Sequence, residues 1–413
     1  MRRLRTASTR RLLTILACAG VLVMSATIAQ AALTGAGPAA APKALAQAIR
    51  DAIDAPAPDG VTARISFTNN LLPGAALPGA SSALTSGADG RLWLAKDGRL
   101  RLELQSGSGD VQITFDDEQV TFSDASSNTV YRAKLPAAPA GAREREHAHE
   151  PPTVARIQDA LDRLAEFWTV SEADPTRPAA GRAAYTVRIA PKDGGGLLGA
   201  AEVAWDALTG VPLRAAVYAQ GRPEPVLELQ ATDISYGAVS STDVAPRSPA
   251  GARIVDLSPE HTKAGAPRTG DKAGAPRTGH ERHGPAVRGA DAVARRLSFP
   301  LAAPRGLAGL PRRSVRLVSL DGRKGALVTY GRGLGAIAVF QHERDRKRAA
   351  PKASGHRGRH QDPLPQFDAG GATATEIATA LGTIVTFDRG GVSYVLAGSV
   401  SPAVAKDAAR GLR

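Results

Sequence analysis

The sequence predicts an α+β protein whose main part is a curved antiparallel half-barrel of about ten strands covered by helices. A small C-terminal α+β domain follows it. Three observations predict this fold class: polar and apolar residues alternate over many short segments, most connections between those segments have three to seven residues, and one long segment has helical periodicity. Alternation gives each strand one apolar face, and such short connections can join only antiparallel neighbours.

Residues 1–31 have the pattern of an export segment. Five arginines precede the uncharged apolar run Leu12–Leu33, and Ala29-Gln30-Ala31 fits the small-residue pattern of a cleavage site. The run is also long enough to span a bilayer, so this segment is either a signal peptide or a retained N-terminal anchor. Both interpretations place the protein in the extracytoplasmic cell envelope, a periplasm-like space, secreted or anchored. The only cysteine, Cys18, lies in this leader, which excludes disulfides and cysteine ligands from the rest.

The half-barrel domain is expected over residues 40–257. A short amphipathic helix, Lys43–Ile53, comes first. A longer helix, Thr153–Trp168, separates two groups of strands and begins at the capping residue Thr153. The expected strands are Val61–Phe67, Arg91–Ala95, Leu100–Gln105, Val111–Phe115, Val120–Phe122, Val130–Lys134, Tyr185–Ile189, Ala201–Trp205, Leu213–Ala219 and Val226–Ile234.

A linker and a second domain complete the chain. Residues 258–298 contain a tandem Lys-Ala-Gly-Ala-Pro-Arg-Thr-Gly repeat, a composition that predicts a disordered linker. The small α+β domain is expected over residues 299–413, with a basic insertion at 342–366 and a C-terminal helix opened by Ser401-Pro402. Its expected strands are Val315–Ser319, Ala326–Tyr330, Ala336–Gln341, Gly382–Phe387 and Val392–Ala397.

The net charge of +13 is concentrated in the leader and in residues 258–298, 299–324 and 341–362. We interpret these basic segments as solvated loops and linkers, or as segments that touch an anionic membrane or a cell-wall polymer. No nucleic-acid-binding module accompanies the charge, so no nucleic-acid partner is expected.

No motif of a known catalytic centre occurs. The sequence has no Gly-x-Ser-x-Gly, no His-Glu-x-x-His and no phosphate-binding Gly-Lys-Ser/Thr loop. All eight histidines fall in predicted loops or linkers, which disfavours a metal site. We therefore expect a protein without enzymatic activity, cofactor or metal.

The apolar faces of the strands are the candidate binding site. Two interpretations remain open: these side chains are an ordinary core filled by helix Thr153–Trp168, or they line a partly empty cavity for an acyl chain. A strongly curved sheet bridged by few and small side chains is difficult to fill, which favours the cavity. The candidate lining residues are Ile65, Phe67, Leu92, Leu94, Leu100, Leu102, Leu104, Phe115, Phe122, Trp205 and Val217.

Three stretches carry a family resemblance. They are Gly90–Leu104 with Val111–Phe122, the segment Ala201–Arg214 with its Asp206 and Thr209-Gly210 hairpin, and the cysteine-poor strand–helix–strand layout. Over roughly residues 40–250 the chain resembles the periplasmic lipoprotein carriers LolA and LolB and the sigma-factor regulators of the RseB type, as an exported, actinobacterial-type member. The segments around Tyr330–Leu334 and Gly382 resemble the small C-terminal domain of RseB-like proteins.

The resemblance implies a half-open barrel that binds acyl chains in a concave apolar cavity. It implies a non-enzymatic cell-envelope protein that binds lipid or lipoprotein acyl chains, for lipoprotein or lipid transport. The alternative that it implies is an RseB-type regulator, which binds a membrane anti-sigma factor or another envelope protein and senses envelope stress.

Overall fold

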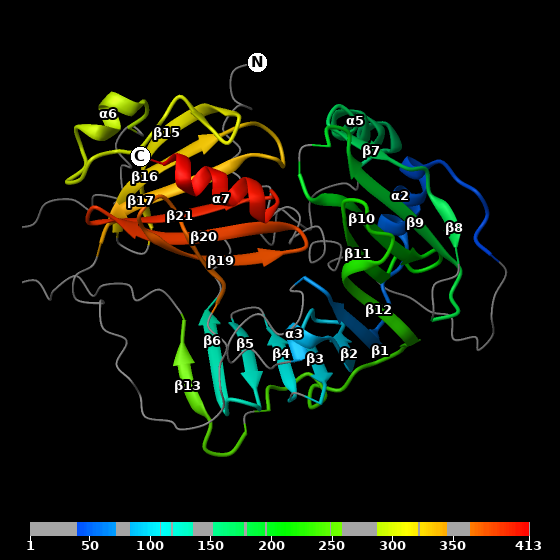
Figure 1. Cartoon of the computed structure of the whole chain (residues 1–413). Helices are drawn as coiled ribbons and strands as arrows, with labels where there is room; N and C mark the ends of the chain where they lie inside the picture. Colours follow the sequence, from blue (N-terminus) through cyan, green and yellow to red (C-terminus); the bar gives the residue numbers. More distant parts are fainter. Residues whose placement is uncertain are drawn as a thin grey trace, which may run out of the picture. The chain divides into compact units, whose positions relative to one another are not determined.

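The computed structural model describes residues 39–71, 83–107, 109–116, 119–134, 152–176, 180–194, 196–247, 249–257, 287–320, 323–344 and 364–412. The predicted leader with Cys18, the tandem repeat and the centre of the basic insertion lie outside these residues. The chain divides into two compact units, whose boundary in the sequence lies between Asp256 and Leu257 (Figure 1).

The first unit is mostly β. Its strands are β1 (Gly60–Asn69), β2 (Ala88–Ala95), β3 (Leu100–Gln105), β4 (Val111–Phe115), β5 (Gln119–Asp124), β6 (Thr129–Lys134), β7 (Trp168–Val170), β8 (Asp174–Thr176), β9 (Ala184–Pro191), β10 (Leu198–Asp206), β11 (Pro212–Ala219), β12 (Pro225–Tyr236) and β13 (Arg253–Asp256). Its helices are α2 (Leu45–Asp54), α3 (Ala83–Ser86) and α5 (Val154–Ala165).

These strands form one 13-stranded sheet in the order β13-β6-β5-β4-β3-β2-β1-β12-β11-β10-β9-β7, with β8 also paired to β9. The predicted antiparallel pairing is confirmed along β1 to β6 and β9 to β12. The prediction of about ten strands and of a purely antiparallel sheet is wrong, because β13 pairs with β6 in parallel. β7, β8 and β13 have only three or four residues each, too few to carry an alternation pattern.

Helices cover less of this sheet than the sequence predicts. α5 begins as expected, with the Thr153 hydroxyl accepting a hydrogen bond from the Arg156 N–H at 3.3 Å. It ends at Ala165, and Trp168 starts β7 instead of closing the helix. α5 packs on α2 and β7, and the two helices cover the sheet near Tyr185 and Trp205. The single turn α3 lies against β1 and β3.

A long connection, residues 237–252, joins β12 to β13. We call it the crossing segment. It lies against the strands that separate β12 from β6: Arg101 of β3 donates to the Asp243 carbonyl at 3.4 Å, and Gln112 of β4 donates to the Arg247 carbonyl at 3.3 Å. Val244 in its middle is buried. Because β13 runs parallel to β6, the chain must return along the sheet before it can pair, and this segment is that return.

The second unit contains a curled antiparallel sheet of eight strands in the order β14-β15-β16-β17-β21-β20-β19-β18 (Figure 1). The predicted strands correspond to β15, β16, β17, β20 and β21. Its strands are β14 (Gly306–Leu307), β15 (Leu310–Leu320), β16 (Arg323–Tyr330), β17 (Ile337–Glu343), β18 (Gln366–Asp368), β19 (Thr373–Thr379), β20 (Gly382–Arg389) and β21 (Val392–Gly398). Its helices are α6 (Ala290–Ala294) and α7 (Pro402–Gly411), and Ser401 caps α7 as predicted.

The core of this unit lies on one face of its sheet. Val315, Val328, Val339 and Leu396 of that face pack with the small side chains of α7 and with the fully buried Val293 of α6. The opposite face of the same strands carries no helix among the described elements of the unit.

Two sequence-based placements are corrected here. Residues 287–298, assigned to the linker, are folded: Arg288 pairs with Arg316 of β15, and α6 follows. The glycine and proline content of the repeat hid this short segment, because five helical residues give no periodic signal. His342, assigned to a loop, is buried in β17, and β18 begins within the predicted basic insertion. Among the described residues, no helix is long and apolar enough to span a bilayer.

Candidate functional site

The strand register brings the predicted lining residues other than Trp205 onto one face of the first sheet. Across β1, β2, β3 and β4, Ile65 stands opposite Gly90, Leu92 opposite Leu102, and Leu100 opposite both Leu94 and Phe115. Since opposite residues of a ladder share a face, we call this the apolar face. The other predicted residues of the same face are Phe67, Leu104, Phe122 and Val217.

A buried cluster occupies the centre of the apolar face. Ile65 and Leu104 are 4% and 2% exposed, and they pack with Leu213 and Ala231 from the other half of the sheet. Because strands on both sides of β1 contribute to one cluster, the sheet bends toward this face. β1 and β12 contain a bulge between Arg64 and Ile65, where the register shifts by one residue, and a bulge increases local bending.

The rim of the apolar face is incompletely covered. Six of the predicted side chains on this face are only half-buried, although all are large and apolar. They are Phe67, Leu92, Leu94, Leu100, Leu102 and Phe122. Phe115 and Val217 are half-buried as well.

The opposite face of the same strands has the reverse character. Arg101, Thr114, Thr121 and Ser123 point away from the apolar face, and all four are buried. The crossing segment lies on this side and bonds to Arg101. In an ordinary two-layer sheet the apolar side is buried and the polar side is wet. At these four positions β3 to β5 therefore bury their polar side, while part of their apolar side is open.

Trp205 belongs to a different part of the molecule. It is buried against Tyr185, with ring centroids 6.0 Å apart, in a cluster with Leu45 and Ala48 of α2. This is the region that α2 and α5 cover. Trp205 is thus a packing residue of the helical end, separate from the cluster around Ile65.

Sequence reasoning missed some members of the apolar cluster. Ile113 lies between Val111 and Phe115 in the same alternation, so the same signal could have identified it. Leu229 and Ala231 come from β12, whose bulge changes the phase of the alternation. Ala83 comes from α3, a single turn without a sequence signature.

An open pocket of about 510 Å³ lies at one end of β1, β2 and β3. Phe67 and Ala88 line it together with polar residues that include Asn69, Asp89 and Gln105. Phe67 is also part of the apolar face, so the pocket adjoins that face where the three strands end.

The Asp206 hairpin has a structural explanation. The Asp206 carboxylate accepts hydrogen bonds from the backbone N–H groups of Leu208 and Thr209 at 2.8 and 3.2 Å. Its other oxygen accepts from Arg182 at 2.6 Å and from the Tyr236 hydroxyl at 2.8 Å. Burial raises the pKa of Tyr236 above its ordinary value, and the neighbouring Asp206 charge adds to the rise. Asp206 therefore holds the turn and β12 together.

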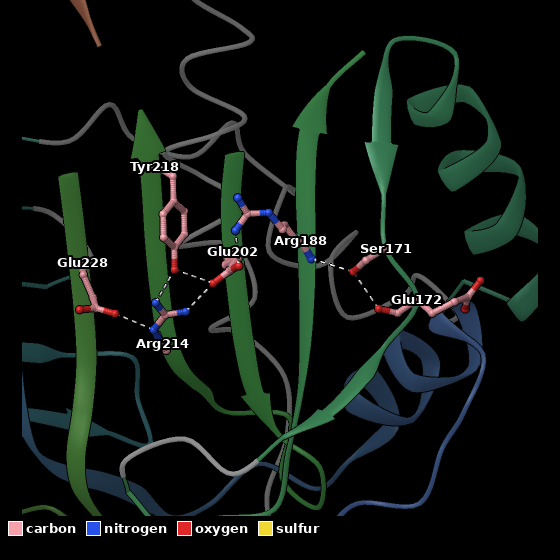
Figure 2. A network of polar contacts seen from close by, with 7 residues as sticks. All are labelled: Ser171, Glu172, Arg188, Glu202, Arg214, Tyr218 and Glu228. Atoms are coloured by element: carbon pink, nitrogen blue, oxygen red, sulfur yellow. Dashed lines mark hydrogen bonds and ion pairs between the residues drawn. The ribbon is translucent and has the colours of Figure 1, made fainter. Parts of the chain in front are cut away.

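A polar network crosses β9 to β12 (Figure 2). Arg214 donates to Glu228 at 2.6 Å and to Glu202 at 2.8 Å, and the Tyr218 hydroxyl donates to Glu202 at 2.8 Å. Arg188 donates to the second Glu202 oxygen at 2.5 Å. Two arginines thus face two glutamates, which leaves the network without net charge.

Burial acts to raise the pKa of Glu202, but the hydrogen bonds from Arg214, Tyr218 and Arg188 outweigh it and hold that pKa below its ordinary value. Ser171 accepts from the Arg188 backbone N–H and donates to the Glu172 carbonyl, so its hydroxyl is engaged with backbone groups (Figure 2). The network joins neighbouring strands by ion pairs between two arginines and two glutamates.

Within the described part of the chain, no group of three or more His, Cys, Asp or Glu side chains is placed to hold a metal ion. The arrangement that these residues do form is an apolar surface. The chemistry that it can support is the burial of an apolar molecule.

No protein-family model and no curated protein sequence matches the chain. Among solved structures, it is similar to the crystal structure of MucB in complex with MucA(peri), at 15% identity over 89% of this chain and 96% of that chain, with a TM-score of 0.38. It is similar to the complex structure of Pseudomonas aeruginosa MucA/MucB at 17% identity over 88% of this chain and 94% of that chain, again with a TM-score of 0.38.

A putative outer membrane lipoprotein-sorting protein domain from Vibrio parahaemolyticus is similar over 45% of this chain and 88% of its own length, at 11% identity and a TM-score of 0.14. At these identities the likeness concerns the fold alone. The chain is thus structurally similar to MucB and to a lipoprotein-sorting protein domain, in agreement with the resemblance predicted from the sequence.

Proposed function

We propose that this chain is a non-enzymatic binding protein of the cell envelope, and that its first unit binds the acyl chain of a lipid or lipoprotein on the apolar face of β1 to β5. One observation carries the proposal: six large apolar side chains of that face are half-buried, while four polar side chains behind them are buried. A sheet that folded only for stability would cover its apolar side first.

The energetics suit an acyl chain. Burying one methylene contributes about 0.8 kcal/mol. A chain of about fourteen carbons would supply roughly 10 kcal/mol before the costs of association and ordering are subtracted. Such a ligand needs no catalytic group and no charged partner on the apolar face. The pocket beside Phe67 offers hydrogen-bonding groups where the polar end of an amphiphile would lie.

The second unit favours a regulator of the RseB type over a simple carrier. It has its own sheet, its own buried core and its own helix α7. A protein that only shuttles an acyl chain has no use for a second folded unit, whereas a regulator needs one surface for the lipid and another for its partner. In this second candidate function, the partner is a membrane-bound anti-sigma factor or another envelope protein, and the bound lipid is the signal.

Saturable uptake of a fluorescent fatty acid by the purified chain from residue 32 onward tests acyl-chain binding. We expect Leu102→Glu to abolish uptake, because it places a charge between Leu92 and Ile113 on the apolar face. Ile254→Glu is the matched control, since Ile254 is 56% exposed in β13 and lies outside the cluster. Far-UV circular dichroism checks that both variants are folded.

Crosslinking gives a test that needs no substitution. A diazirine-bearing fatty acid should label peptides of β1 to β5 and spare those of β7 to β10. Absence of saturable uptake, or label confined to other strands, would refute the proposal. Carrier and regulator then differ in one measurement: a carrier passes the labelled fatty acid to acceptor vesicles, whereas in a regulator the fatty acid releases a captured membrane protein.

A further inference from the structure

The second unit begins with a strongly basic, folded segment. Residues 287–324 contain nine arginine and lysine residues and two aspartates. Six of the nine cations are exposed: Arg288, Arg295, Arg296, Arg305, Arg313 and Lys324. The sequence suggests that such charge lies in loops. The structure instead attaches it to β15, to its partner strands and to α6.

The cations follow the outer side of β15, which pairs with the two-residue strand β14 and, at Arg316, with Arg288; we call this side the β15 edge. β15 has eleven residues, which corresponds to a length of roughly 35 Å. Arg305 is joined to Arg312 at one end through the bond from the Arg312 N–H to the Arg305 carbonyl, and Lys324 pairs with Ser319 at the other end. Arg288 and Arg316 stand directly opposite each other in the middle.

This edge lacks counter-charges. No ion pair joins Arg288, Arg295, Arg296, Arg305, Arg312, Arg313, Arg316 or Lys324 to a carboxylate within the described residues. Like charges directly opposite each other in a ladder destabilise it, so the pair Arg288 and Arg316 costs the isolated molecule stability. The Arg316 Nε is buried without a hydrogen-bond partner. An external anion would remove this cost.

The sheet face beside the central pair is apolar. In register, Arg316 stands next to Leu327, Leu327 next to Phe340, and Phe340 next to Val395. This row is on the face opposite the core, because the residues that alternate with it, Val328 and Val339, are core residues. Leu327, Phe340 and Val395 are half-buried, and Ile384 farther along the same face is 40% exposed.

We propose that the β15 edge and the adjoining apolar row of the second unit dock onto an anionic phospholipid bilayer. Arg288, Arg316 and the exposed cations along the edge would contact lipid phosphates. Leu327, Phe340 and Ile384 would face the boundary between headgroups and acyl chains. This inference does not depend on acyl-chain binding by the first unit.

The distribution of charge favours a bilayer over a single acidic segment of a protein. Unpaired cations spread over the whole length of β15 match a surface with many phosphates, whereas one short segment of a protein would satisfy only a few of them. The apolar row beside the arginines has no role in binding a soluble polyanion, but it has one at a membrane interface. Arginine forks also bind phosphate oxygens in pairs.

Vesicle co-sedimentation tests the proposal. The chain from residue 32 onward should bind vesicles of phosphatidylcholine with 30% phosphatidylglycerol and not vesicles of phosphatidylcholine alone. Removing Arg288, Arg296, Arg313 and Lys324 together, each to Gln, should weaken binding about 100-fold or more, since each cation near an anionic surface contributes about fivefold. Ile384→Ser should lower the binding that remains at high salt.

The matched control changes four exposed cations of the first unit, Arg64, Arg91, Arg222 and Arg253, to Gln. It lowers the net charge equally and should leave at least tenfold tighter binding than the β15 variant. Equal losses in both variants would overturn the proposal, because binding would then follow net charge alone. Failure to bind anionic vesicles, or binding of soluble polyglutamate but not of vesicles, would overturn it as well and assign the edge to an acidic polypeptide.

Discussion

At the residue scale, the Asp206 hairpin shows how one short motif can join three elements. Asp206 ends β10, its side chain holds the turn, and Tyr236 of β12 donates to it. Gly210 follows in the left-handed region, with φ of +68°. A Cβ at this glycine would lie 2.4 Å from the Ala52 carbonyl oxygen of α2. The motif therefore packs a helix against a hairpin.

Gly210→Ala should destabilise the first unit by at least about 2 kcal/mol, because alanine is strained in this conformation and its Cβ collides with backbone. Gly98→Ala is the matched control: Gly98 also has a positive φ, of +86°, but a Cβ there meets nothing within 4 Å. It should cost about 1 kcal/mol, the conformational part alone. Urea unfolding measures both values. Equal losses would show that α2 does not pack on the hairpin as described.

The network around Glu202 makes the first unit sensitive to acid. Its pKa is held below the ordinary value, so Glu202 stabilises the folded state above pH 4.3, the approximate pKa of an unfolded glutamate. That stabilisation is lost as the pH falls through the folded pKa. Protonation would leave Arg188 and Arg214 without one of their acceptors.

Glu202→Gln should lower the free energy of unfolding by about 1–3 kcal/mol at neutral pH, because the half-buried Arg214 and the exposed Arg188 lose a charged partner. It should also flatten the decline of stability between pH 5 and pH 3. Glu166→Gln is the control, since Glu166 is exposed at the end of α5. The proposed role of the network is refuted if both variants have the pH profile of the unchanged protein.

At the element scale, the sequence predicts the long strands well and the short ones poorly. Leu100–Gln105 is found with the predicted bounds, since Leu100, Leu102 and Leu104 face a cluster that the ladder places on one side. β13 could not be predicted, because its pairing with β6 depends on a connection that returns past β1 to β5. Trp168 was assigned to a helix by its spacing, and the turn before β7 overrides that periodicity.

The sequence predicts most residues of the candidate site, but not the elements that cover them. Polar and apolar alternation identifies most residues of the apolar face, because every second side chain of a strand points to the same face of the sheet. Which elements cover that face depends on tertiary contacts. The amphipathic helix α5 was a reasonable cover, but its Leu161 packs with the cluster of Tyr185 and Trp205.

At the scale of the whole molecule, the two units have separate cores, and different spectroscopic signals follow their unfolding. The three tryptophans, Trp93, Trp168 and Trp205, all belong to the first unit. Leu104 is buried in the first core and Leu396 in the second. Fluorescence therefore reports the first unit, and circular dichroism reports both.

Leu396→Ala should lower the free energy of unfolding of the second unit by about 2–5 kcal/mol. The circular dichroism transition should then shift, whereas the tryptophan fluorescence transition should stay where it is. Leu104→Ala should shift the fluorescence transition by a similar amount. Urea titrations followed by both signals check this. If each variant moved both signals together, the two units would unfold as one, contrary to their division.

The crossing segment also makes the two faces of the first sheet differ in how accessible they are. Residues 237–252 are covalently continuous with β12 and β13, and they occupy the polar side of β3 and β4 with the chain's own backbone. Because this segment occupies the polar side of β3 and β4, a ligand that binds β2 to β5 as proposed would have to approach from the apolar face.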